Sequence, residues 1–288
     1  MRFRGYIPKE KFKIGKDNRT GKTMKYAIVS DIHGNLEAFR AVLEKCGQLG
    51  VNQYICLGDT VGYGADPSAC LQLLRSLNPL AVVKGNHDEF ASNDDEVMEG
   101  FNPHARAAVL WTKSQLSADE REYLARLPLR MSPRGTKLTV VHATLDSPDS
   151  WGYIFDSHHA ADNFAYQYTL LCFCGHSHVP LAFCKKPVLM HSGKPIEEIA
   201  DWAMHGETDF TRETYAEIFI QNGFKYLVNV GSVGQPRNRD PRASFAVYDD
   251  EKMVITRYTI PYDIATAQAK IRAAGLPERL ATRLEVGG

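Results

Sequence analysis

The sequence predicts a single α/β domain with a largely parallel central sheet, because strand-like and helix-like segments alternate between residues 24 and 88. The chain of 288 residues is within reach of one large domain. An apolar fraction of 44% and a charged fraction of 24% are ordinary for a globular protein. No apolar run is long enough to predict a transmembrane helix, and the N-terminus lacks the apolar segment of a secretory signal. We therefore expect one well-formed core.

The order of the elements supports this fold class. Apolar runs typical of buried strands lie at 24–30, 53–57 and 80–83, and helical periodicity follows the first two at 35–50 and 68–77. Residues 104–116 are amphipathic, and a capping box from Ser117 to Glu120 predicts the start of another helix. Later strands are expected at 137–141, 170–174, 225–230, 244–248 and 253–260. The last three of these indicate a second sheet with antiparallel members.

Three regions are distinguished along the chain. Residues 1–24 form a basic N-terminal arm, which we interpret either as a surface hairpin or as a segment that attracts an anionic substrate. The main domain is expected over 25–260, with an insertion at 185–224 that is acidic and difficult to assign. Residues 261–288 are expected to form a helical tail, broken near Gly275.

Charge and cysteine content restrict the class of partner. The formal net charge is zero, so nothing in the composition favours a nucleic-acid or membrane partner. The six cysteines are scattered, mostly within apolar runs, and predict free thiols in a cytoplasmic protein. Composition also leaves a homo-oligomer open.

Polar residues of metal-ligand type directly follow five of the expected strands. They are Asp31-Ile-His33, Gly58-Asp59, Gly85-Asn86-His87-Asp88, His142 and Gly175-His176-Ser177-His178. The carboxyl ends of parallel strands line the ligand crevice of an open α/β sheet, so these side chains can converge on one point. Each motif alone is common in ordinary turns, but five together predict a metal site. The absence of cysteine among them favours Mn²⁺, Fe or catalytic Zn²⁺ over a structural zinc site.

In order and spacing these motifs resemble the calcineurin-like metallophosphoesterase superfamily, and most closely its small prokaryotic phosphodiesterase-like branch. The resemblance extends through His33-Gly34-Asn35 and through the segment from Asn229 to Arg237, and covers roughly residues 24–260. It implies a four-layer sandwich, in which two mixed β-sheets are flanked by helices. The basic arm and residues 185–224 depart from the pattern of this branch.

The resemblance also implies two divalent metal ions, for which we expect Mn²⁺ first, with Fe, Zn²⁺ or Ni²⁺ as alternatives. One ion would be held by Asp31, His33 and His178. The other would be held by Asn86, His142 and His176, and Asp59 would bridge the two. A carboxylate suits the bridge because two neighbouring cations need a shared anionic oxygen. A hydroxide activated by the metals would attack phosphorus in line.

The remaining candidates surround this centre. His87 is assigned to the substrate, either stabilising the transition state or protonating the leaving oxygen. Asp88 either accepts from the His87 ring and fixes its tautomer, or caps a helix, and the two roles are compatible. Asn35, Tyr63 and Arg237 are candidate substrate-binding residues. Asn35 would donate a hydrogen bond to a phosphate oxygen, Tyr63 would form a wall of the pocket, and Arg237 would bind the phosphate through its guanidinium. Their structural alternatives are a turn residue, ordinary packing and a surface ion pair with Asp240.

The predicted function is therefore metal-dependent hydrolysis of phosphoesters, with phosphodiesters preferred. We expect a small phosphorylated substrate, with nucleotides among the candidates. The alternatives are a phosphomonoesterase and a hydrolase of dinucleoside polyphosphates or nucleotides. A protein phosphatase is disfavoured because the segment after Asp59 lacks the Asp and Arg that such enzymes of the superfamily usually carry. A non-catalytic scaffold of the same fold is a remote alternative, since such a protein should have lost ligand positions that are intact here.

Overall fold

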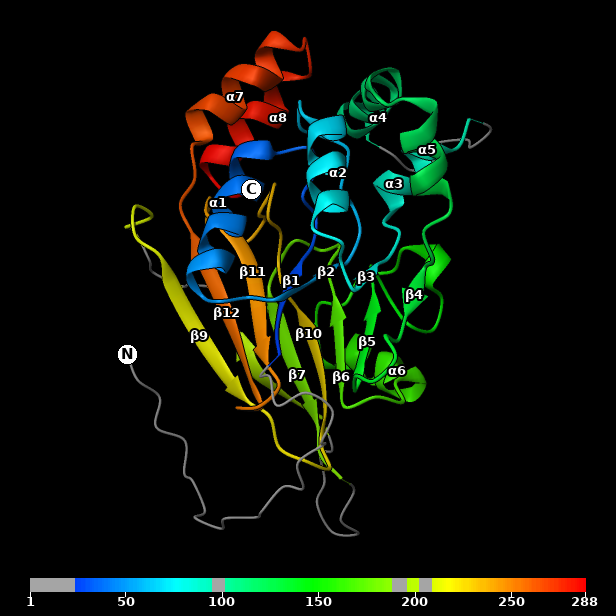
Figure 1. Ribbon diagram of the computed structural model, residues 1–288, viewed down its shortest axis with the longest axis vertical. Coiled ribbons are helices and arrows are strands. Elements are labelled where there is room, and N and C mark those ends of the chain that lie inside the picture. Colours follow the sequence, from blue (N-terminus) through cyan, green and yellow to red (C-terminus); the bar gives the residue numbers. More distant parts are fainter. Residues whose placement is uncertain (1–23, 95–101, 188–195, 202–208) are drawn as a thin grey trace.

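The computed structural model describes residues 24–94, 102–187, 196–201 and 209–288. Two six-stranded mixed sheets pack against each other, and helices cover their outer faces (Figure 1). The expected basic arm lies almost entirely outside the described residues. None of the helices in the described ranges is both long and apolar enough to cross a membrane.

The first sheet has the strand order β3-β2-β1-β11-β12-β9. Its strands are β1 (Lys25–Val29), β2 (Gln53–Cys56), β3 (Ala81–Val82), β9 (Thr214–Phe219), β11 (Ala243–Asp249) and β12 (Val254–Ile260). Strands β1, β2 and β3 are parallel, whereas β11, β12 and β9 extend the sheet by antiparallel pairing. The parallel half is the one that the sequence predicts from its alternating strands and helices.

The second sheet has the order β4-β5-β6-β10-β7-β8. Its strands are β4 (Arg130–Met131), β5 (Leu138–Val141), β6 (Leu171–Cys174), β7 (Leu181–Lys185), β8 (Ile196–Asp201) and β10 (Lys225–Asn229). Strands β5, β6 and β10 are parallel, and β4, β7 and β8 pair antiparallel at the two sides. Each sheet thus contains one parallel group, and these groups deliver the polar loops discussed below.

The core lies between the two sheets. Alternate residues of a strand point to opposite faces, so Tyr26 and Ile28 of β1 face the second sheet while Ala27 and Val29 face outward. The outward face is covered by α1 (Leu36–Gln48) and α2 (Pro67–Ser76). Because both faces are covered, β1 is continuously apolar after Lys25 instead of alternating.

A helix also covers the outer face of the second sheet. Helix α6 (Ser157–Tyr166) packs Ala160 and Phe164 against Cys172 and Cys174 of β6. The order of layers is therefore α1 and α2, first sheet, second sheet, α6. This arrangement confirms the predicted four-layer sandwich.

Further helices surround the carboxyl ends of the parallel strands (Figure 1). They are α3 (Asn86–Ser92), α4 (Pro103–Gln115), α5 (Ala118–Ala125), α7 (Ile264–Ala273), α8 (Glu278–Thr282) and the 3₁₀ turns Pro148–Ser150 and Arg283–Glu285. The capping box at Ser117 is present, and the C-terminal helices are separated at Gly275, where φ is +69°. Both features agree with the sequence.

Several elements of the structure were not predicted from the sequence. They are α3, α6, β4, β7, β8 and β9. The stretch 185–224, expected to be an insertion, supplies β8 and β9, which are edge strands of the two sheets. Edge strands pack on fewer neighbours than central ones, so their hydrophobic pattern is weaker and a sequence signal is hard to detect.

Candidate metal centre

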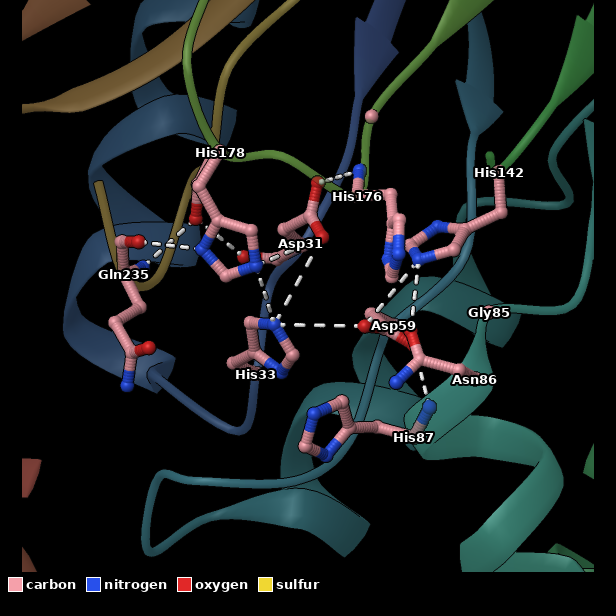
Figure 2. Close-up of polar contacts among 12 residues, drawn as sticks. Asp31, His33, Asp59, Gly85, Asn86, His87, His142, His176, His178 and Gln235 are labelled. Atoms are coloured by element: carbon pink, nitrogen blue, oxygen red, sulfur yellow. Dashed lines mark hydrogen bonds and ion pairs between the residues drawn. The ribbon is translucent and has the colours of Figure 1, made fainter. Parts of the chain in front are cut away.

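The loops that leave β1, β2, β3, β5 and β6 converge on one buried cluster (Figure 2). Backbone hydrogen bonds join these loops to one another. The amide of His33 donates to the carbonyl of Asp59 at 2.9 Å, and the amide of Gly175 donates to that of His142 at 2.9 Å. All seven expected ligands are brought together with exposures of 9% or less: Asp31, His33, Asp59, Asn86, His142, His176 and His178.

Five of the ligand candidates have a left-handed backbone, a conformation that non-glycine residues rarely adopt. They are Asp31, His33, Asp59, His176 and His178, with φ between +50° and +65°. Such conformations cost free energy and persist only where the surrounding structure determines them. Their concentration at these strand ends indicates that the fold holds the side chains in a specific arrangement.

Glycines beside the ligands allow the loops to pack this closely. A Cβ atom on Gly85 would lie 2.0 Å from Oδ1 of Asp59. A Cβ atom on Gly175 would lie 2.6 Å from Oδ2 of Asp31. The glycines that precede Asn86 and His176 in the sequence therefore leave room for a carboxylate from another loop.

Each of the four histidine ligands uses one ring nitrogen to bind a backbone carbonyl. The pairs are His33 Nδ1 with Val61 at 3.0 Å, His142 Nδ1 with Leu57 at 2.8 Å, His178 Nδ1 with Gln235 at 2.6 Å and His176 Nε2 with Trp151 at 2.8 Å. A carbonyl only accepts, so the bonded nitrogen carries the proton. The other nitrogen of each neutral ring has a lone pair, as a metal ligand requires.

The first group of ligands consists of Asp31, His33 and His178. Nε2 of His178 lies 3.2 Å from Oδ1 of Asp31 and 3.2 Å from Nε2 of His33. Oδ2 of Asp31 accepts from the amide of His176, whereas Oδ1 is buried without a hydrogen-bond donor among the described residues. Two imidazole lone pairs and a carboxylate oxygen therefore face one another, and a cation between them would satisfy all three. This group fits a divalent metal ion.

The second group consists of Asp59, Asn86, His142 and His176. Nε2 of His142 lies 3.4 Å from Oδ2 of Asp59 and 3.3 Å from Oδ1 of Asn86. Ligand atoms of Asp59, His142 and His176 are near enough to share an ion. Since Nε2 of His176 donates to Trp151, the nitrogen that it can offer to a metal is Nδ1.

Asp59 lies between the two groups (Figure 2). Its Oδ1 accepts from the amide of His87 at 2.8 Å, which fixes the carboxylate. Its Oδ2 lies 3.6 Å from Nε2 of His33 and 3.4 Å from Nε2 of His142, one from each group. This position is the one that a bridging ligand needs.

The electrostatics of the cluster favour metal-binding protonation states. Burial lowers the pKa of His33 and His178, and lowers that of His176 to about 3. Burial opposes ionisation of Asp59, but His142 and the other histidines outweigh it and hold its pKa well below the ordinary value. For His142 the attraction of Asp59 overcomes burial and raises the pKa to about 9. A metal must displace that proton.

His87 lies beside the ligands on α3 and is buried. Its ring centroid is 4.9 Å from that of His33 and 4.3 Å from that of Tyr63. Burial lowers its pKa to about 4, partly offset by Asp59. A group of His33, Asp59 and His87 is also compact enough to hold an ion, so geometry alone allows His87 two roles.

The expected contact between Asp88 and the His87 ring is wrong. The Asp88 carboxylate accepts from four backbone amides: Asp59 at 2.7 Å, Thr60 at 3.0 Å, Val61 at 3.3 Å and Gly85 at 3.1 Å. The bond from Gly85 is the helix-capping alternative, and the other three hold the loop that carries Asp59. Asp88 thus positions Asp59 and has no contact with the reacting centre that would make it catalytic.

The expected phosphate contact of Asn35 is also contradicted. Its Oδ1 accepts from the amide of Ala38 and caps α1. Its Nδ2 donates to the carbonyl of Gly234 at 2.8 Å and to the Tyr262 hydroxyl at 3.2 Å. The side chain is 4% exposed and its hydrogen-bonding groups are already used, so the turn-residue interpretation holds.

Tyr63 and Arg237 lie at the edge of the cluster. The Tyr63 ring packs against His33 with centroids 4.6 Å apart, and the Arg237 guanidinium lies over the Tyr63 ring at 5.6 Å. The expected ion pair of Arg237 with Asp240 does not form, because Asp240 binds Arg242 through two hydrogen bonds. Arg237 instead has a buried Nε without a partner among the described residues. Its Nη2 donates to Oε1 of Gln235 at 3.0 Å, and the guanidinium forms no ion pair with a carboxylate among the described residues.

One loop beside the expected ligands was missed by the reasoning from sequence. Residues Trp151, Tyr153 and Phe155 follow no predicted strand, yet the Tyr153 ring stacks on His176 with centroids 4.2 Å apart. Their alternation about Ile154 is a signal that could have suggested an extended segment with one aromatic face.

Comparison with known proteins agrees with this geometry. A calcineurin-like phosphoesterase superfamily domain matches residues 24–253. The chain belongs to the calcineurin-like phosphoesterase superfamily. The match includes all seven ligand candidates and ends before α7.

Two relatives span nearly the whole chain, and a third matches about half of it. An uncharacterized protein of Methanocaldococcus jannaschii, MJ0912, is 37% identical over 264 residues, covering 91% of this chain and 97% of that protein. The crystal structure of a metallophosphoesterase from Sphaerobacter thermophilus is 38% identical, with a TM-score of 0.76, and covers 93% of this chain and 100% of its own. A symmetrical bis(5'-nucleosyl)-tetraphosphatase of Dechloromonas aromatica is 31% identical over 151 residues, 46% of this chain and 54% of that protein.

Proposed function

We propose that this protein is a phosphoester hydrolase that uses two divalent metal ions and acts preferentially on phosphodiesters. The observation that carries the proposal is the position of Asp59 Oδ2 between Nε2 of His33 and Nε2 of His142. A single metal site needs no carboxylate shared between two groups of ligands. Mn²⁺ is the preferred ion, because the donor set combines imidazole, carboxylate and amide oxygen without thiolate.

The residues then have distinct tasks. Two divalent ions, when bound, supply a water of lowered pKa and offset charge on the phosphoryl oxygens. The backbone carbonyls of Val61, Leu57, Trp151 and Gln235 fix the tautomers of the ligating histidines. His87 faces the substrate and donates a hydrogen bond to a phosphoryl or leaving oxygen. Arg237 binds a further phosphate oxygen through its guanidinium.

A nucleotide substrate has specific support. The relative from Dechloromonas aromatica is named as a tetraphosphatase of bis(5'-nucleosyl) substrates, although it matches only part of this chain. Arg237 lies outside the groups of expected ligands and is not paired with a carboxylate among the described residues, so a second phosphate could bind it. Hydrolysis of nucleoside polyphosphates is therefore the second candidate within the same chemistry. The intact ligand set argues against a non-catalytic scaffold.

Metal analysis and a substrate panel test the proposal together. Protein dialysed against Mn²⁺ should contain about two ions per chain, by analogy with two-metal phosphoesterases. It should hydrolyse bis-p-nitrophenyl phosphate faster than p-nitrophenyl phosphate. A chain that binds less than one ion under these conditions contradicts the two-metal proposal, and a faster monoester reaction reverses the substrate preference.

Two variants separate the roles of the residues. Asp59→Asn should bind both metal ions more weakly and should have no turnover, because the negative charge of the bridging carboxylate is removed. His87→Ala should reduce kcat by about 10²- to 10⁴-fold, the range for a lost general acid, while metal content stays near that of the wild type. His158→Ala, at an exposed position on α6, is the matched control. Loss of metal from His87→Ala would instead identify His87 as a ligand.

A further inference from the structure

The segment from Trp151 to Phe155 presents two aromatic rings beside the metal centre. Ile154 is buried against α6 and the second sheet, whereas Tyr153 and Phe155 are 43% and 53% exposed. In an extended segment alternate side chains share a face, and burial of Ile154 therefore directs its two neighbours outward. The Tyr153 and Phe155 rings stack at a centroid distance of 5.3 Å, with an angle of 10° between their planes.

This aromatic pair packs directly against a metal-ligand candidate. The Tyr153 ring stacks on His176 at 4.2 Å with an interplanar angle of 18°. The carbonyl of Trp151 accepts from Nε2 of the same histidine. Only the Tyr153 ring therefore lies between Phe155 and His176 in this stack. The phosphoryl group would bind at the metal ion that His176 is expected to hold. The segment is fixed before any substrate arrives, which reduces the entropic cost of binding.

Tyr153 and Phe155 also line an open groove of about 560 Å³, a size suited to a small-molecule substituent. Asp146, Asp162 and His159 also line the groove, whereas no Lys or Arg in the described part of the chain does so. Two exposed carboxylates disfavour a phosphate in this groove, whereas they accept hydrogen bonds from amino groups. An uncharged aromatic group with amino donors satisfies both the rings and the carboxylates.

We propose that this groove is a nucleobase subsite: the base of a nucleoside phosphate stacks on Phe155 and directs its exocyclic amino group toward Asp146 and Asp162. The inference rests on the proposed phosphoesterase function, because the metals are assigned to the phosphate of the same molecule. Stacking on an aromatic side chain contributes about 1–3 kcal/mol per base, which corresponds to roughly a 5- to 150-fold gain in affinity.

Binding of three matched phosphonates to the Mn²⁺-loaded protein tests the subsite. They are the 5′-methylenephosphonate analogues of adenosine, purine riboside and methyl riboside, whose P–C bond resists hydrolysis. Methyl riboside lacks the base, and purine riboside lacks only the amino group. We expect the adenosine analogue to bind at least about fivefold more tightly than the methyl riboside analogue. Its affinity should also exceed that of the purine riboside analogue.

Phe155→Ala should remove the preference for a base and leave the affinity of the methyl riboside analogue unchanged. Phe219→Ala is the matched control, because Phe219 is 68% exposed on β9 of the other sheet. Equal binding of the adenosine and methyl riboside analogues to the wild type overturns the subsite, as does a preference that survives Phe155→Ala. Equal binding of the adenosine and purine riboside analogues overturns the assignment of the carboxylates.

Hydrolysis of bis-p-nitrophenyl phosphate, measured on the same wild-type preparation, keeps the two proposals apart. Turnover without a preference for a base rejects the subsite and retains the hydrolase. A preference for a base that depends on Phe155, without turnover of any phosphoester, retains the subsite and rejects the hydrolase.

Discussion

Replacement of Asp88 by Asn tests how the loop that carries Asp59, the proposed bridging ligand, is held. The carboxylate is fully buried, and each of its oxygens accepts from two backbone amides. An asparagine keeps one oxygen and places an NH₂ group where the other was. Two buried amides, either those of Thr60 and Val61 or those of Asp59 and Gly85, then face a donor instead of an acceptor.

The magnitude follows from the number of bonds lost. Each buried donor left without an acceptor costs about 1–3 kcal/mol, so two such donors cost about 2–6 kcal/mol. One effect acts in the opposite direction: burial and the charge of Asp59 raise the pKa of Asp88 to about 7, and a neutral side chain relieves that repulsion. We therefore expect a decrease near the lower half of the range, about 3 kcal/mol in the free energy of unfolding.

Urea denaturation followed by far-ultraviolet circular dichroism, in the presence of a chelator, measures this decrease without a contribution from bound metal. Asp156→Asn is the matched control, because Asp156 is exposed and caps α6 with only one oxygen, Oδ1. Asparagine can cap a helix in the same way, so the control should lose less than about 1 kcal/mol. If Asp88→Asn loses no more than Asp156→Asn, the four amide contacts do not hold the loop as argued.

Three further outcomes are expected. Asn35→Ala should lower the free energy of unfolding by about 1–2 kcal/mol, because the α1 cap is lost. The kcat of the metal-loaded protein should change only a few-fold. A loss of activity as large as that of His87→Ala would instead indicate that Asn35 contacts the substrate. Removal of metal with a chelator should lower Tm, and Mn²⁺ at a hundred times its Kd should stabilise the protein by about 2.7 kcal/mol for each ion bound, which a calorimetric titration of Tm against metal concentration checks. Thiol titration with a disulfide reagent should detect the cysteines only after denaturation, because burial raises the pKa of Cys46, Cys56 and Cys174 to about 12; rapid reaction of the native protein would contradict their burial.

The parallel half of each sheet was predictable from sequence because its strands are covered on both faces. Continuous apolar runs such as 26–29 and 171–174 are therefore visible without an alignment. The edge strands β8 and β9 lie on the borders of the sheets and do not have this pattern. Helix α3 was missed for another reason: it starts at Asn86, inside a motif interpreted as a loop of ligands.

The identities of the candidate ligands were predictable, but their geometry was not. The type and position of residues at five strand ends indicated a metal site, because parallel strand ends meet at one edge of a sheet. The left-handed backbone at Asp31 and Asp59 has no sequence signal, since these residues adopt it only under constraint from neighbouring loops. The partners of Asp88 and Asn35 were misassigned for the same reason. Their hydrogen bonds go to backbone groups, which every residue carries and no motif identifies.

Because hydrogen bonds to backbone groups have no sequence motif, the residues beside the metal centre that would contact the substrate could be identified only in the structure. The four histidines are oriented by carbonyls of residues outside the ligand motifs, and one of these carbonyls belongs to Trp151. That bond leaves Nδ1 of His176 for a metal and also anchors the segment that carries Tyr153 and Phe155. A change that moves the Trp151 carbonyl should therefore affect the metal centre as well as the groove. In this chain, the proposed base subsite and the orientation of the His176 ring both depend on one short loop that lies outside the expected ligand motifs.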